Sequence, residues 1–469
     1  MMLLAELAPS PARLGKAPFV LYYPASSGYF TIARHEAPEV GPFLHTYEAR
    51  VAGGDVLHVG THPPGLFLVF HSLGAAVDQW PLLRDLALAT MPASFHDACE
   101  LVTENTAQTP HPMTRHEAAI LWLATLLVIS LAAATCIPLY FLTVQYASAR
   151  TAWLTAALWP LVPAVTIFIP KSDAAFPFLS MSLICGIAWL CRSRNHFTRM
   201  WQLLGGLAWG GLAALSMLQT LAFAPILLMA FLYGAWTGGL SLSQSLDDDG
   251  RQATRRNAIA AIAIIAGFVG SIELFHFFNG ANLWQIWWQN SLNHSRFYEV
   301  SPRSTWLWFL VAPLELMIAA GWPVFLRAWA PLTGMPGTEA GDLWHPGSVS
   351  TAGSKWTRIV MSLGERSRTG DGERLAICCL SVWIWLWLSG KNSGEVARLW
   401  IFLMPLLLWL PVVLVSRSEQ ENQAKPLEGE QTPKSQAEAG LWLTAQMIAC
   451  VLTVWRVSGF DFGGGVFDS

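Results

Sequence analysis

The hydrophobic pattern of the chain changes near residue 117. After it, runs of about 20 apolar residues alternate with polar connections, and this length crosses a bilayer as an α-helix. Because only Gln219-Thr220 separates the fourth run from the fifth, these two form either a tight hairpin or one broken helix. The pattern predicts ten membrane-spanning helices, at roughly 118–143, 152–169, 174–191, 201–218, 220–238, 257–278, 305–326, 375–389, 397–416 and 438–456.

Residues 1–117 contain no apolar run of spanning length. Within them, Phe19–Phe30 is typical of an aromatic loop, whereas Trp80–Thr106 is amphipathic and predicts one or two helices in the membrane surface. The polar inserts near 328–373 and 417–437 have a composition typical of disorder. The predicted organisation is a first loop at 1–117, transmembrane helices 1–7 at 118–327, a disordered insert at 328–373, helices 8 and 9 at 374–416, a polar loop at 417–437, and the last helix with its tail at 438–469.

Composition supports the membrane interpretation. The 469 residues are 53% hydrophobic and 13% charged, whereas soluble domains carry about 25% charged residues. The net charge of −3 is uninformative, and the absence of a basic run argues against a nucleic-acid partner. We therefore expect membrane lipid, and no nucleic acid, among the partners of the chain.

The distribution of basic residues predicts an orientation. Sixteen of the 28 Lys and Arg residues fall in one alternating set of connections, and basic loops remain on the cytoplasmic side. Both long polar inserts belong to that set, so residues 1–117 are expected to face outward. The predicted fold class is an all-α polytopic membrane protein with about ten transmembrane helices and a large outward first loop that carries interfacial helices.

The first loop contains the segment Asp55-Val-Leu-His58-Val-Gly-Thr61-His62-Pro63-Pro64-Gly65. A residue before proline avoids helical angles, while proline is tolerated in the first helical turn. Pro63-Pro64 should therefore open an apolar helix, at about 64–77, that is too short to span a bilayer. Its N-terminus would present His58, Thr61 and His62 beside unpaired backbone N–H groups, an arrangement suited to phosphate. The alternative is a rigid loop-to-helix corner.

Three short charged loops share the predicted outward face: 170–173, 293–303 and 390–398. An enzyme at a membrane surface needs carboxylates that accept a proton or bind a metal, and cations that hold a phosphate. The candidate carboxylates are Glu48, Asp55 and Asp173, and Asp173 is also the candidate ligand of a divalent metal, the one cofactor considered. The candidate substrate and phosphate ligands are His58, His62, Lys171, Arg296, Arg303, Lys391, Glu395 and Arg398.

These motifs resemble the GT-C superfamily of membrane glycosyltransferases, such as the bacterial protein O-mannosyltransferases and aminoarabinose transferases. The resemblance rests on Tyr47-Glu48 to Asp55, on His62-Pro63-Pro64, on Asp173, and on Gly394-Glu395-Val-Ala-Arg398-Leu-Trp400. It departs from the family at Ser26-Ser27-Gly28-Tyr29-Phe30, which lacks the early acidic residue. Glu48 and Asp55 are therefore substitutes for that residue.

The resemblance implies an enzyme of the bacterial inner (plasma) membrane whose active site faces outward. It would transfer a sugar from a polyprenyl-phosphate-linked donor to a glycan, lipid or protein acceptor. The alternative is a non-catalytic transporter or envelope-assembly protein. A transporter should carry polar or broken segments near mid-membrane in paired halves. This chain concentrates its polar residues at one surface, which favours the transferase.

The family also implies a spanning helix ahead of the first loop, and none precedes residue 117 here. Export of so long an amino-terminal segment is unfavourable without such a helix. We therefore expect the chain to be truncated, with a further apolar helix encoded upstream of Met1.

Overall fold

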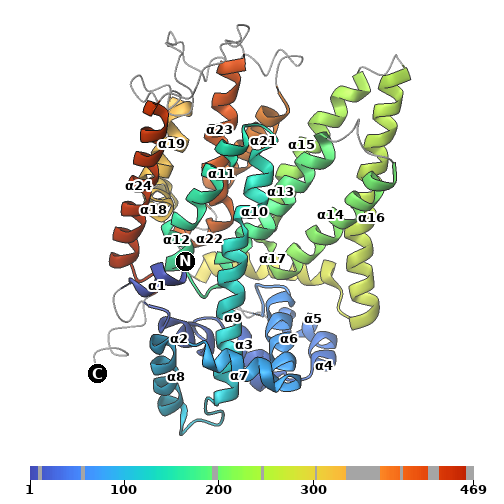
Figure 1. The fold of residues 1–469 in the computed structure, drawn as a ribbon. Coiled ribbons are helices and arrows are strands. Elements are labelled where there is room, and N and C mark those ends of the chain that lie inside the picture. The colour runs from blue at the N-terminus through green and yellow to red at the C-terminus, as the bar shows by residue number, and fades with distance from the viewer. Residues whose placement is uncertain are drawn as a thin grey trace.

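A computed structural model describes residues 1–8, 13–53, 59–192, 199–243, 248–300, 304–333, 370–390, 394–420 and 433–460. Within these ranges all regular structure is helical. Figure 1 shows two parts: short helices from the first hundred residues gather at one end of a bundle of longer helices, and α9 runs from the first part into the second. The all-α prediction is confirmed for the described residues.

The amino-terminal part consists of short helices and two longer ones, α6 and α8. Their connections turn at prolines, for example Pro64 before α6 and Pro92 before α8. The predicted helix behind Pro63-Pro64 is confirmed, although it begins at Gly65. The elements are α1 (Met2–Glu6), α2 (Lys16–Tyr22), α3 (Tyr29–Thr31), a π-helical turn η1 (Ile32–Glu36), α4 (Val40–His45), α5 (Tyr47–Ala52), α6 (Gly65–Gln79), α7 (Pro81–Ala89) and α8 (Ala93–Thr106).

Two sequence-based expectations for this part have clear outcomes. The segment 19–30 is not only a loop, because α2 and α3 occupy much of it. The amphipathic segment 80–106 was predicted to form one helix or a pair of helices, and it forms a pair, α7 and α8. Trp80, Leu82 and Leu86 remain exposed beside α7, so part of its apolar surface is not covered by the described chain.

Helix α9 (Arg115–Ala134) is anchored where the two parts meet. Thr114 caps it: its hydroxyl accepts from the backbone N–H of Glu117, and the Glu117 carboxylate accepts from the backbone N–H of Thr114. Such a reciprocal capping box satisfies two helix-end donors. Glu117 also lies 2.8 Å from His35 Nε2 of η1. The first turn of α9 is thus bound to the amino-terminal part before the apolar run begins.

The bundle contains the remaining helices, several of them broken. They are α10 (Cys136–Thr143), α11 (Ala149–Leu158), η2 (Trp159–Leu161), α12 (Pro163–Ile167), η3 (Ser172–Ala174), α13 (Phe176–Arg192), α14 (Arg199–Gln219), η5 (Leu221–Phe223), α15 (Ala224–Ser243), α16 (Asp248–Asn279), α17 (Leu283–Val300), α18 (Thr305–Ala320), α19 (Trp322–Thr333), α21 (Asp371–Leu388), α22 (Val396–Leu399), η6 (Ile401–Leu403), α23 (Met404–Gln420) and α24 (Pro433–Arg456). The bulk of both predicted polar inserts lies outside the described residues.

By length and composition, four described helices can cross a membrane: Arg115–Thr143, Ser172–Cys191, Met200–Gln219 and Ala258–Asn279. The number rises to six if each of two sharply bent pairs is one span, Gly65–Gln79 with Pro81–Ala89 and Trp306–Ala320 with Trp322–Trp329. Leu221–Thr237, Ile401–Leu414 and Gly440–Arg456 are shorter apolar helices. A helical protein with membrane-crossing helices is therefore supported, while the count of ten stays a prediction.

Several predicted single spans are interrupted, among them 152–169 and 305–326. The segment 152–169 is divided among α11, η2 and α12, with Pro160 and Pro163 at the breaks. The segment 305–326 is two helices, α18 and α19, that meet at an angle of 119°. Gly321 lies at this bend with a φ of 86°, a conformation that favours glycine.

A buried amide holds this bend in place. Gln446 of α24 is fully buried, and its Nε2 donates to the carbonyls of Ala320 (2.9 Å) and Leu161 (2.8 Å). Its Oε1 accepts from the backbone N–H of Val324 at 3.3 Å. One side chain thus satisfies backbone groups that the helix breaks would otherwise leave unpaired in an apolar interior.

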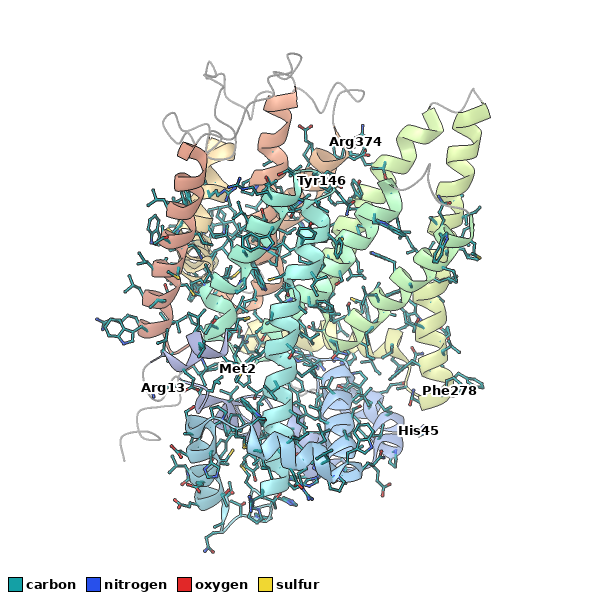
Figure 2. The ribbon with its side chains drawn as sticks, in the orientation of Figure 1. Met2, Arg13, His45, Tyr146, Phe278 and Arg374 are labelled. Carbon is teal, nitrogen blue, oxygen red and sulfur yellow. The ribbon has the colours of Figure 1, made fainter. Side chains whose placement is uncertain are left out.

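Helix α17 corrects another expectation. Residues 293–299 were predicted to be part of a short charged loop, but they continue α17, which lies across the base of the bundle in Figure 1. It packs against α5 of the amino-terminal part. Figure 2 shows His45 and Phe278 at this end of the molecule, and Tyr146 and Arg374 at the other.

A charged cluster beside the proline corner

The proline corner, residues Gly60–Gly65, is fixed from several sides. Tyr47 Oη donates to the carbonyl oxygen of His62 at 2.7 Å, and Thr61 Oγ1 lies 2.9 Å from His62 Nδ1. Gly65 approaches α14 so closely that a Cβ there would lie 2.3 Å from the carbonyl oxygen of Leu218. The corner is therefore a rigid start to α6, as the rigid-corner alternative proposed. This rigidity leaves the phosphate hypothesis open.

A second group of side chains comes from two distant segments. Asp173 lies in η3 and Arg398 in α22, and these elements pack against each other. Arg398 Nε lies 3.7 Å from Asp173 Oδ2, and a nitrogen of its guanidinium donates to Glu395 Oε2 at 2.8 Å. We call Lys171, Asp173, Glu395 and Arg398 the charged cluster. The predicted convergence of Asp173 and Arg398 is confirmed.

Lys171 joins the cluster to α3. Its ammonium donates to the carbonyl oxygen of Ser26, in the turn before α3. Burial, reinforced by the nearby Arg398 charge, lowers the pKa of Lys171 to about 8, although Asp173 and Glu395 act in the opposite direction. Lys171 therefore remains mainly protonated at neutral pH, and the cluster contains two cations and two carboxylates.

Tyr29 connects the charged cluster to the proline corner. Gly28 precedes it with a φ of 72°, which glycine adopts readily, and this turn directs the chain into α3. The Tyr29 ring packs edge-on against His62, at 5.6 Å between centroids, and against Phe67 at 5.0 Å. Burial raises the pKa of Tyr29, and the Asp173 charge raises it further while Arg398 lowers it. Tyr29 thus lies within electrostatic reach of the cluster and in contact with the corner.

The cluster is partly open to its surroundings. The side chains of Asp173 and Arg398 are 20% and 27% exposed. Arg398 Nε is buried and has no hydrogen-bond partner within the described part of the chain. Since a guanidinium carries five N–H donors in a fork that matches carboxylate and phosphate oxygens, Arg398 retains donors for an anion.

The other predicted site residues lie elsewhere or are not described. Glu48 accepts from the backbone N–H of Asn282 at 2.6 Å, so its carboxylate sits at the N-terminus of α17. Arg296 is exposed on α17, and its guanidinium lies 3.5 Å from Asn293 Oδ1. Within the described residues, neither side chain forms a hydrogen bond or an ion pair with the cluster. Asp55, His58, Arg303 and Lys391 fall outside the described residues.

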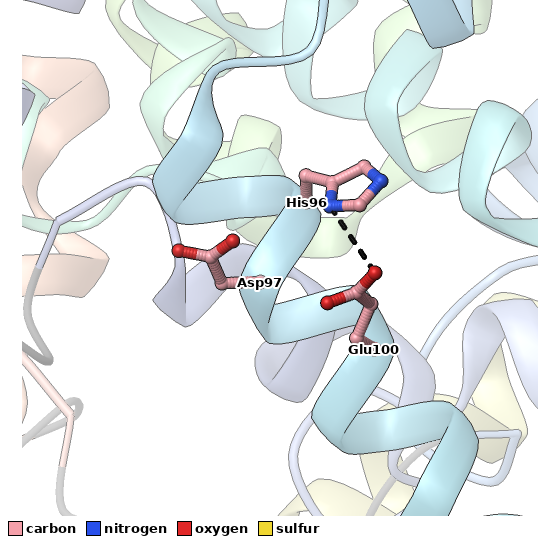
Figure 3. A group of neighbouring side chains, drawn as sticks. All are labelled: His96, Asp97 and Glu100. Atoms are coloured by element: carbon pink, nitrogen blue, oxygen red, sulfur yellow. Dashed lines mark ion pairs between the residues drawn. The ribbon is translucent and has the colours of Figure 1, made fainter.

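The predicted metal role of Asp173 does not fit its surroundings. Two of the four side chains in the cluster are cations, and the nearest of them, Arg398, lies between both carboxylates. A divalent cation requires several oxygen ligands without competing positive charge. Within the described ranges, the one group spaced like metal ligands is His96, Asp97 and Glu100 on the exposed face of α8 (Figure 3). There His96 and Glu100 form an i, i+4 pair at 3.7 Å.

The sequence predicted no site role for Tyr29 or Asn290, and it placed Asn293 only in a charged loop and a glycosylation sequon. Tyr29 follows a glycine in an aromatic stretch, a signal for a tight turn that presents an aromatic ring. Asn290 and Asn293 lie three residues apart, which places both on one helix face. That spacing becomes informative only once 283–300 is known to be a helix.

Comparison with known proteins adds no assignment. No protein-family model, curated protein or solved structure matches this chain. The function must therefore be inferred from the fold, the charged cluster and the proline corner.

Proposed function

We propose that this chain is a membrane glycosyltransferase that uses a polyprenyl-phosphate-linked sugar. The observation that carries the proposal is the placement of Asp173 and Arg398 near the proline corner, with Tyr29 connecting the charged cluster to that corner. A cation with spare donors, a nearby carboxylate and a helix start are the groups that transfer from a phosphate-linked donor requires.

The proposed reaction assigns each group one task. An acceptor hydroxyl oxygen bonds to the anomeric carbon as the bond from that carbon to the phosphate oxygen breaks. The hydroxyl proton passes to the Asp173 carboxylate, and the lipid phosphate leaves with the bonding electrons. Arg398 and Lys171 stabilise the charge that develops on the phosphate. His62 and the start of α6 form the neighbouring wall of the site.

The apolar helices support the choice of donor. A polyprenyl chain partitions into a bilayer, so its phosphate is delivered at the membrane surface. Four to six described helices have the length and composition to place this chain in a bilayer. The site is proposed to face outward, on the side of the amino-terminal part, and the proposed location is a bacterial inner membrane.

Mass spectrometry of envelope glycans tests the proposal. Cells that lack this protein are supplied with the wild type, with Arg398→Ala, or with Arg456→Ala as a control. Arg456 is an exposed arginine at the end of α24, outside the cluster. We expect a sugar-bearing species that requires the wild type or the Arg456 variant and disappears with Arg398→Ala. Identical glycans with and without the protein would reject the transferase in favour of a non-catalytic membrane protein.

A further inference from the structure

Helix α17 has an unusual distribution of polar side chains. Asn290 and Asn293 are fully buried, whereas Trp284, Trp288 and Leu292 on other faces are exposed, Trp288 by 69%. Asparagine is mostly exposed in proteins, and burying an amide costs free energy unless it is hydrogen-bonded. The two buried asparagine amides must therefore have hydrogen-bond partners that offset the cost of burying them.

Those partners are backbone groups of the proline corner and of α5. Asn293 Nδ2 donates to the carbonyl oxygens of Gly60 and Val51, each at 2.8 Å. Asn290 Nδ2 donates to the same Gly60 carbonyl at 2.8 Å. Two buried amides thus converge on a single carbonyl one residue before Thr61-His62.

The acceptor side of Asn293 is also engaged. Its Oδ1 accepts from Gln289 Nε2 at 3.1 Å, and an Arg296 nitrogen lies 3.5 Å away. These contacts fix which end of the amide faces Gly60. Arg296, predicted from the sequence to hold phosphate, therefore lies beside Asn293 and not in the charged cluster.

The same hydrogen bonds decide whether Asn293 can be glycosylated. Asn293-His294-Ser295 matches a glycosylation sequon. Because the Asn293 amide is buried with both hydrogens donated to backbone carbonyls, it cannot also accept a glycan in this fold.

We infer that Asn290 and Asn293 are positioning residues that hold the proline corner at a fixed distance from α17. If the proposed function holds, the two asparagines also fix where His62 and the start of α6 meet the donor phosphate. This catalytic consequence rests on the proposed function. The structural part of the inference stands on the hydrogen bonds alone.

Hydrogen–deuterium exchange of the full chain in detergent tests the structural part without requiring activity. Asn293→Ala should speed exchange in a peptide covering 59–68 by about tenfold, the equivalent of about 1.4 kcal/mol for a lost buried hydrogen bond. Peptides from α9 and α13 should be unchanged. Should Asn293→Ala fail to fold, Asn290→Ala carries the same test, because its amide donates to the same corner.

Ser295→Ala is the matched control. It destroys the same sequon, yet Ser295 is exposed on α17 and bonds within its own helix, to the Ser291 carbonyl. It should leave exchange at 59–68 at the wild-type rate. Equal effects of Ser295→Ala and Asn293→Ala, unchanged exchange at 59–68, or faster exchange throughout the chain would each overturn the inference.

A kinetic readout separates this inference from the proposed function. In a transferase assay, Asn293→Ala should lower kcat about tenfold with a smaller change in KM, as expected when transition-state geometry is lost. If the wild type shows no transfer, the proposed function fails while the exchange experiment still decides the role of the two asparagines.

Discussion

Two polar side chains next to broken helices, Gln446 and Arg398, differ in how completely they are paired. Gln446 is fully buried, and its amide makes hydrogen bonds through both its nitrogen and its oxygen to backbone groups at the α18–α19 bend. Arg398 is partly exposed, and within the described part of the chain its side chain makes one hydrogen bond, to Glu395. Its buried Nε lies too far from Asp173 for a hydrogen bond.

The difference indicates what each polar group does. A buried polar group that only stabilises a fold should be neutral and fully paired, because unpaired groups cost free energy in an apolar interior. A binding group must keep donors in reserve for its ligand. Gln446 fits the description of a structural group, and Arg398 fits that of a binding group.

The largest effect that this comparison predicts is on turnover. Arg398→Ala removes a donor to the leaving phosphate and should reduce kcat about 100- to 1,000-fold, or ~3–4 kcal/mol. The free energy of unfolding should change little, because the side chain is only partly buried. Turnover and thermal unfolding of the purified variant measure both quantities. Turnover within a few-fold of wild type would remove Arg398 from the site.

The reverse pattern is expected at the bend. Gln446→Leu leaves the carbonyls of Ala320 and Leu161 and the N–H of Val324 without their partner, which should lower the free energy of unfolding by about 2–3 kcal/mol. Denaturant unfolding in detergent measures this loss. Thr444→Ala, on the exposed face of the same helix, is the control and should be close to neutral. A Gln446 variant as stable as that control would contradict the structural role.

A smaller effect concerns pH. Burial places the pKa of Lys171 at about 8, against 10.5 in an unfolded chain. Between these values the unfolded chain binds more protons, so this residue makes the free energy of unfolding rise with pH. Phosphate binding has the opposite sign, because it needs the ammonium and weakens as pH rises through about 8.

Lys171→Arg separates the two effects. Its guanidinium stays protonated, so the affinity for a polyprenyl phosphate should no longer decline near pH 8. Affinity titrations of both proteins from about pH 7 to about pH 10 provide the measurement. A wild-type affinity that is constant over this range would exclude Lys171 as a phosphate ligand.

Some of this architecture could be predicted because apolar runs determine where helices form. The start of α9 and the helix behind Pro63-Pro64 follow from such runs and from proline stereochemistry. The proximity of Asp173 and Arg398 could also be predicted, because successive membrane spans bring every second connection to the same face of the membrane.

Other features depend on contacts that no local pattern contains. Gly321 lies within an apolar run, so 305–326 resembled one span until the bend and its partner Gln446 were located. Glu48 resembled a catalytic base by its place in the first loop, yet it lies at the N-terminus of α17 because residues 280–283 pack there. Burial of Asn290 and Asn293 required a partner loop more than 200 residues away in sequence.

Direct binding of a polyprenyl monophosphate tests the central claim, that the charged cluster holds the phosphate of a lipid-linked donor. Native mass spectrometry or calorimetry in lipid nanodiscs would compare the wild type, Arg398→Ala and Arg456→Ala. We predict that Arg398→Ala weakens binding at least about tenfold, because a hydrogen bond to a charged group contributes about 1.5–3 kcal/mol, and that Arg456→Ala binds like the wild type. Equal affinity for all three proteins, or no binding by the wild type, would contradict the account.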